Sequence, residues 1–243
     1  TSFLAETVEE IKLAIANLVN FDINIGDNVM TMSEVNEEDW ATAWKQYYHP
    51  VKISERFTIV PTWEDYTPVS TDELIIELDP GMAFGTGTHH TTNMCMARLE
   101  KILTKDDVVF DVGTGSGILA IAAALLGAKE VKAVDIDAVA VRVAQENISD
   151  NGLTDRIDVK EGDLLRGTEG KADVIIANII ADIIIMLLKD IPGKLEEDGI
   201  FLASGIIKER QADIEAAAKE VGMQVDHVDE KGGWVVMQMS KVK

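Results

Sequence analysis

A glycine-rich turn after the apolar run of residues 108–112 has the most recognisable chemistry in this sequence. Its pattern is Gly113-x-Gly115-x-Gly117, and a carboxylate, Asp111, stands two positions before the first glycine. Glycines let the backbone pass close to a ligand, and the helix that follows begins with unpaired backbone N–H groups. Dinucleotide folds instead have G-x-G-x-x-G and bind a pyrophosphate, which a carboxylate would repel. The turn therefore favours S-adenosyl-L-methionine, whose amino-acid group is cationic, over NAD.

Two further carboxylates follow apolar runs and could hold the nucleoside part of such a cofactor. Asp135 ends the run of residues 131–134, where a carboxylate can accept hydrogen bonds from both ribose hydroxyls. The alternative role for Asp135 is a helix N-cap, for which Asp137 is the better candidate. Asp163 follows residues 157–159 and could accept a hydrogen bond from the adenine amino group, although an ordinary turn aspartate would look the same.

Asn178 stands directly after the apolar run of residues 174–177. A neutral amide there can accept a hydrogen bond from an amine without adding a charge that would keep the amine protonated. Many amine methyltransferases have Asn-Pro-Pro-aromatic at this place, but isoleucines and alanine follow here, which argues against stacking a flipped base. We predict Asn178 as the catalytic residue for methyl transfer to an amine, with a structural turn asparagine as the alternative.

Residues 79–92 combine three glycines, four threonines and two histidines. This composition predicts a mobile loop over a site, because a plain linker needs neither an aromatic residue nor so many hydroxyls. We assign Phe84, Thr86 and His89 to a substrate loop. The two histidines have no Cys or His partners at ligand spacing, so no metal site is predicted.

The chain from residue 106 onward supplies a scaffold for these residues, because strand and helix patterns alternate regularly there. Five strand–helix units and a closing hairpin at Gly232-Gly233 predict an α/β fold with a doubly wound, mostly parallel, seven-stranded, Rossmann-like sheet. Such sheets bind ligands at the carboxyl ends of their strands. The predicted strands of the sheet are residues 108–112, 131–134, 157–159, 174–177, 200–203, 224–228 and 234–239; the predicted helices are residues 93–103, opened by Thr92, and 118–126, 138–151, 183–195 and 209–221. Before this scaffold, residues 57–60 are predicted to form a short strand that Pro61 ends.

The first 50 residues have a different pattern. Residues 3–19 have the apolar spacing of a helix, and residues 29–35 alternate like a strand. One helix and one strand alone cannot bury both faces of the strand. We predict a partial small α/β domain over residues 1–36, a linker helix over 37–50 and a catalytic domain over 51–243.

The charge balance restricts the partners. The chain has 43 acidic and 22 basic residues, a net charge of −21, with no basic stripe. Such a field repels a phosphate backbone and attracts a basic protein, although solubility alone would also explain it. One cysteine, no signal peptide pattern and no apolar run of 18 residues lead us to expect a cytoplasmic protein without a membrane partner.

Together these residues resemble the PrmA family, bacterial methyltransferases of ribosomal protein L11 of the large subunit. The resemblance rests on residues 79–89, on residues 113–122 and on Asn178-Ile179, and residues 44–50 resemble the family's linker. It extends over essentially the whole chain. It implies methyl transfer from S-adenosyl-L-methionine to lysine ε-amines and the N-terminal α-amine of that basic protein, free or on the large subunit.

The resemblance also implies a ferredoxin-like substrate-recognition domain, whose second half would be residues 1–36. Methylation of a small molecule or a nucleic acid, and a noncatalytic cofactor-binding scaffold, are the rival interpretations. The acidic charge and the missing aromatic residue count against nucleic acid, and we expect no direct binding to it. The predicted cofactor-binding residues are Thr92, Gly113, Gly115, Asp135, Ile136, Asp163 and Asn178.

Overall fold

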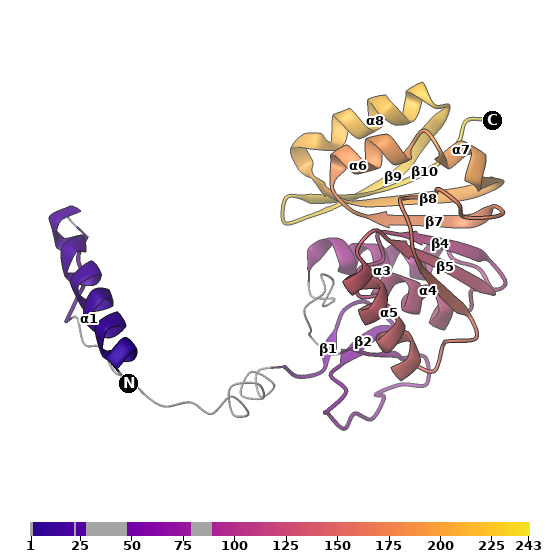
Figure 1. Cartoon of the computed structure of the whole chain (residues 1–243). Helices are drawn as coiled ribbons and strands as arrows, with labels where there is room; N and C mark the ends of the chain where they lie inside the picture. The colour runs from indigo at the N-terminus through magenta and orange to yellow at the C-terminus, as the bar shows by residue number, and fades with distance from the viewer. Residues whose placement is uncertain (1, 22, 28–47, 79–88) are drawn as a thin grey trace. The chain divides into compact units, whose positions relative to one another are not determined.

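The computed structural model describes residues 2–21, 23–27, 48–78 and 89–243, which belong to two compact units, Thr1–Gln46 and Tyr47–Lys243 (Figure 1). In the first unit, α1 (Ser2–Asn17) is followed by a short 3-10 helix, η1 (Leu18–Phe21), so the helix predicted over residues 3–19 is present. The strand predicted over residues 29–35 and residues 37–47 of the predicted linker helix lie outside the described residues. Residues 48–50, which were predicted to end that helix, are not helical. No helix in the described ranges is long and apolar enough to cross a bilayer.

A small sheet opens the second unit. In it, β1 (Val51–Lys52) pairs antiparallel with β2 (Phe57–Val60), and β2 pairs in parallel with β3 (Leu74–Glu77). The sequence analysis predicted only β2. It missed β3 because four residues after a turn-rich segment give too short an apolar run to distinguish a strand from a loop. Phe57 and Ile76 are fully buried and join the main core.

The predicted seven-stranded sheet is present, and it is mostly parallel. Its strands are β4 (Val108–Val112), β5 (Glu130–Asp135), β6 (Ile157–Glu161), β7 (Ala172–Asn178), β8 (Leu195–Ile207), β9 (Met223–Lys231) and β10 (Trp234–Lys241). They are ordered β6-β5-β4-β7-β8-β10-β9, and of these seven strands β10 runs opposite to the other six. Because β4 pairs with β5 on one side and β7 on the other, the strand order reverses at β4. The carboxyl ends of β4 and β7 therefore form the switch point at which such sheets bind ligands.

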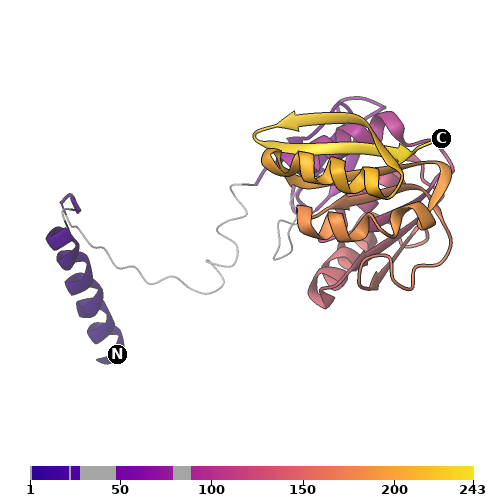
Figure 2. The same ribbon diagram turned by 90° about the horizontal axis from the view of Figure 1, so that it is seen from above.

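Helices cover both faces of this sheet (Figures 1 and 2). On one face lie α3 (His90–Ile102), α4 (Ile118–Leu126) and α5 (Ala138–Asp150), and on the other α6 (Ala181–Leu187), α7 (Ile191–Lys194) and α8 (Gln211–Glu220). Val109 packs into the first layer and Phe110 into the second, so β4 is buried on both sides. Burial on both sides gives the continuous apolar runs from which the strands were predicted.

Two of the helices predicted alongside the sheet differ from the structure by more than two residues at one end. The helix predicted over residues 183–195 is two helices, α6 and α7, because Pro192 has no backbone N–H with which to continue the first one. The other correction concerns α3, which begins at His90 rather than at residue 93. Its N-cap is His89, whose Nδ1 accepts a hydrogen bond from the Thr91 backbone N–H at 3.3 Å. Thr92, predicted to open this helix, is instead fully buried in its first turn.

Candidate functional site

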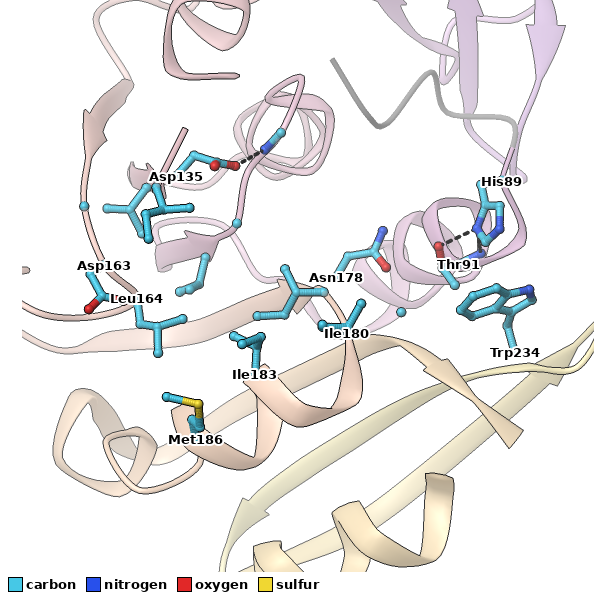
Figure 3. A pocket seen from close by; sticks show the side chains of 18 residues that line it. His89, Thr91, Asp135, Asp163, Leu164, Asn178, Ile180, Ile183, Met186 and Trp234 are labelled. Atoms are coloured by element: carbon cyan, nitrogen blue, oxygen red, sulfur yellow. Dashed lines mark hydrogen bonds between the residues drawn. The ribbon is translucent and has the colours of Figure 1, made fainter. Parts of the chain in front are cut away.

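A cavity of about 700 Å³ lies at the carboxyl ends of β4, β5 and β7 (Figure 3). Its wall is mostly apolar with a few polar groups, as is usual for small-molecule sites. Figure 3 shows Asp135, Asp163 and Leu164 toward one end and His89 and Trp234 toward the other. Asn178 lies between these two ends, so the cavity has a carboxylate-bearing end and an aromatic end.

Most of the predicted site residues come together here. The cavity is lined by Gly113, Gly115, Asp135, Ile136, Asp163, Asn178 and His89. Thr92 is not among the lining residues; it is buried behind Asn178, whose Nδ2 donates to Thr92 Oγ1 at 3.4 Å. Phe84 and Thr86 lie outside the described residues. Within the described ranges, no three His, Cys, Asp or Glu side chains gather as a metal site would require.

Asp135 holds the glycine turn in place. Its Oδ2 accepts the Gly115 N–H at 2.8 Å and its Oδ1 accepts the Asp137 N–H at 3.0 Å. Each carboxylate oxygen has a second lone pair, so the group can still accept hydrogen bonds from hydroxyls in the cavity. The N-cap of α5 is Asp137, whose carboxylate accepts from the Val139 N–H at 2.8 Å. The structure thus leaves Asp135 available to a ligand.

The loop after β6 contributes two adjacent residues to the same end. Asp163 forms an ion pair with Arg166 on the exposed side of the loop. Leu164 has a φ of 56°, a conformation that residues with a side chain rarely adopt, and it lines the cavity. Rare backbone conformations of this kind persist where surrounding structure enforces them, often at ligand sites. The sequence analysis missed Leu164 because nothing in a leucine indicates its backbone angle.

Asn178 ends β7 in the middle of the cavity wall (Figure 3). Its Oδ1 is buried and has no hydrogen-bond partner among the described residues. An unsatisfied buried acceptor costs about 1–3 kcal/mol, and native proteins keep few of them. A ligand that donates a hydrogen bond at this point would satisfy it.

His89 and Trp234 form the aromatic end. Their ring centroids lie 4.9 Å apart, edge to face at 76°. Nδ1 of His89 also lies 2.8 Å from Thr91 Oγ1. The sequence analysis placed Trp234 in a closing strand and gave it no role, because its place depends on the hairpin folding back beside α3. The Gly232-Gly233 turn directly before it was the one available signal.

Family comparison agrees with this geometry. The model of the family described as "Ribosomal protein L11 methyltransferase (PrmA)" matches residues 1–242. The chain belongs to this family. The ribosomal protein L11 methyltransferase of Anoxybacillus flavithermus is 56% identical over 240 residues, which are 99% of this chain and 77% of that one. The one from Bacillus pumilus is 54% identical over 234 residues, 96% of this chain and 75% of that one.

Solved structures confirm the predicted Rossmann-like fold. The ribosomal protein L11 methylase from Lactobacillus delbrueckii subsp. bulgaricus is 43% identical, with a TM-score of 0.77 over 81% of this chain and 100% of that one. A putative SAM-dependent methyltransferase from Streptococcus mutans is 14% identical, with a TM-score of 0.54 over 63% of this chain and 49% of that one, and shares the fold alone. The resemblance stated from the sequence motifs is therefore correct, and the chain is a methyltransferase.

Asp111 has a different place in this methyltransferase from the one we expected. We expected it to face a cationic ligand, but it is 1% exposed and is not among the lining residues. Its carboxylate accepts from the Thr114 hydroxyl at 2.6 Å. Burial raises the pKa of Asp111 to about 6, although hydrogen bonds from Thr114 and the Ala120 backbone oppose the rise. Asp111 thus stabilises the glycine turn from the buried side, through its hydrogen bond with Thr114.

Asp111→Asn is expected to stabilise the protein at neutral pH. The pKa of Asp111 rises from 3.8 to about 6 on folding, so its contribution to stability is complete below pH 3.8 and is lost as the pH rises through 6. The ionised group costs about 3 kcal/mol above that range. In urea unfolding, the free energy of unfolding of the variant minus that of the parent should grow by about 2 kcal/mol as the pH rises from about 4.5 to about 7.5. If this difference in the free energy of unfolding stays constant over the pH range, the raised pKa of a buried Asp111 is contradicted.

Proposed function

We propose that this methyltransferase transfers methyl groups from S-adenosyl-L-methionine to lysine ε-amines and to the N-terminal α-amine of ribosomal protein L11. The observation that carries the proposal is the buried Oδ1 of Asn178, which accepts no hydrogen bond from any described residue and lies in one cavity with the glycine turn. An amine is the donor that such a neutral acceptor suits. The names of the relatives, which are ribosomal protein L11 methyltransferases, support the choice of protein.

The residues at the carboxylate-bearing end suit the nucleoside of this cofactor. Asp135 retains lone pairs for ribose hydroxyls, and Asp163 lies next to Leu164 where a purine edge would need an acceptor and an apolar contact. The turn at Gly113 lets the backbone come close to a ligand, because glycine has no side chain and adopts the φ of 73° without strain. When bound, the cofactor supplies an electrophilic methyl group on a sulfonium leaving group.

The chain's own groups have to bind the amine in its neutral form and aim it. A lysine amine has a pKa near 10.4 in water, and burial in an apolar cavity lowers that pKa. The Asn178 oxygen would accept an amine N–H and so point the nitrogen lone pair into the cavity, toward the side that would hold the cofactor. The amine would take the methyl group, S-adenosyl-homocysteine would leave, and the proton of the resulting ammonium would pass to water.

We also propose the domain division for this function. Residues 1–36 would be the second half of a substrate-recognition domain, residues 37–50 a linker and residues 51–243 the catalytic domain. The compact units divide between Gln46 and Tyr47, inside the proposed linker. A substrate of this kind would be met in the cytoplasm.

Labelled cofactor separates this proposal from its rivals. The protein is incubated with S-adenosyl-L-methionine carrying a tritiated methyl group and with a bacterial extract, and the labelled product is identified by mass spectrometry. Label on lysine and N-terminal amines of L11 supports the proposal. Label on RNA or on a small molecule, or no turnover despite cofactor binding, would overturn it.

The net charge of −21 should speed capture of a basic protein substrate. We therefore expect kcat/KM for L11 to fall as salt rises beyond about 0.1 M, where screening shortens the range of the field. Initial rates at limiting L11 over a salt series measure this. A salt-independent kcat/KM would mean that the acidity serves solubility alone.

A further inference from the structure

Ile179 lies between two glycines that belong to different walls of the cavity. On one side is Gly113, where a Cβ would be 2.4 Å from Cγ2 of Ile179. On the other is Gly205 in β8, where a Cβ would be 2.4 Å from the carbonyl oxygen of Ile179 and 2.9 Å from its nitrogen. Cβ atoms do not approach other atoms this closely, so neither glycine can carry a side chain unless Ile179 moves.

Ile179 directly follows Asn178, whose carboxamide oxygen is the proposed hydrogen-bond acceptor for the amine. Asn178 pairs with Ser204 in the ladder between β7 and β8, and the Ile179 N–H donates to the Ser204 carbonyl at 3.1 Å. The Asn178 side chain itself has a long hydrogen bond, 3.4 Å, to Thr92. The carboxamide is therefore placed chiefly by the backbone of residues 178–179, and Ile179 fixes that backbone against the glycine turn.

We propose that Ile179 is a positioning residue that sets the separation between the Asn178 carboxamide and the cofactor's glycine turn. The inference rests on the proposed function, because it concerns the two groups that would hold the amine and the cofactor. The contact of its Cγ2 with Gly113 limits how close the two walls can come, and the contact of its backbone with Gly205 limits how far they can separate. A displacement of about 1 Å can cost on the order of a hundredfold in rate.

Gly205→Ala tests the backbone contact, and Gly222→Ala is its matched control. Both glycines have positive φ, 79° and 74°, but a Cβ at Gly222 would meet nothing within 4 Å. Both variants thus bear the same backbone strain, and only one displaces Ile179. We expect Gly205→Ala to lower kcat with L11 by about a hundredfold. Its calorimetric Kd for S-adenosyl-L-methionine should stay within about threefold of the parent's. Gly222→Ala should change neither value by more than about twofold.

A rescue experiment keeps the test decisive if Gly205→Ala does not fold. A Cβ at Gly113 would meet only side-chain atoms of Ile179, whereas one at Gly205 would meet its backbone. Adding Ile179→Ala to Gly113→Ala should therefore raise kcat at least about tenfold above that of Gly113→Ala alone. Adding Ile179→Ala to Gly205→Ala should not raise kcat. Failure to rescue Gly113→Ala would overturn the proposal by itself, and so would rescue of a folded Gly205→Ala. So would an Ile179→Ala variant with weaker cofactor binding and unchanged kcat, because Ile179 would then be only an apolar wall.

A nuclear magnetic resonance readout separates this inference from the proposed function. The side-chain amide signal of Asn178 should shift in Gly205→Ala and stay in place in Gly222→Ala, whether or not L11 is the substrate. An unshifted signal in Gly205→Ala would overturn the positioning role. A parent protein that methylates no L11 while these shifts appear would instead overturn the assignment of the substrate.

Discussion

Asn178→Ala is expected to lower kcat by about a hundredfold while the protein stays folded. The Oδ1 that the change removes has no partner among the described residues, and the Nδ2 bond to Thr92 is long at 3.4 Å, so the fold loses little. What is lost is the acceptor that aims the amine. Single-turnover methylation of L11 measures the rate, and thermal unfolding measures the stability.

Asn178→Asp is the matched variant for this experiment. It keeps an oxygen in the same place but adds a charge that stabilises the ammonium form of the substrate. We expect part of the activity to remain, with the pH optimum moved upward. If Asn178→Ala instead unfolds and its folded fraction turns over normally, Asn178 only forms a turn and the assignment of the site fails.

Asp135→Ala is expected to weaken binding of S-adenosyl-L-methionine by roughly 2–4 kcal/mol, because a charged two-point acceptor is removed. The hydrogen bonds of Asp135 to the N–H groups of Gly115 and Asp137 are lost as well, so the glycine turn should loosen. Calorimetry measures the affinity of both proteins, and NAD should show no binding to the parent.

Asp155→Ala is the control for the change in net charge, since Asp155 is an exposed carboxylate of the same unit. It should leave the cofactor affinity as it is in the parent. Unchanged affinity in Asp135→Ala, or detectable NAD binding by the parent, would refute the cofactor assignment.

The sheet and most of the cavity residues were predictable from the sequence, for a physical reason. Strands such as β4 and β7 are buried on both faces, so they appear as unbroken apolar runs, and the polar residues that follow them fall at one edge of the sheet. Asp135 and Asn178 were found in this way. Their place at the cavity follows from strand order alone.

Other features depend on contacts between distant segments and could not be predicted from local patterns. The positive φ of Leu164 belongs to a loop whose path no local pattern reveals. At Gly205 a side chain is excluded because the Ile179 backbone lies against it. Asp111 was correctly singled out but given the wrong surroundings, because a strand residue next to a turn can face either the core or the cavity. Trp234 reaches the cavity through a hairpin whose partners lie far away in the chain.

The place of β10 bears on how the protein is made. β10 follows β9 in the chain but lies between β8 and β9 in the sheet, so β9 cannot join the sheet until β10 has been synthesised. Arg98 of α3 donates to Gln238 of β10 from Nε at 2.8 Å, which ties α3 to the last strand of the sheet. Trp234 reaches the cavity only after this insertion. A nascent chain halted before β10 leaves the ribosome would therefore present an open sheet edge to chaperones and lack Trp234 at the aromatic end of its cavity.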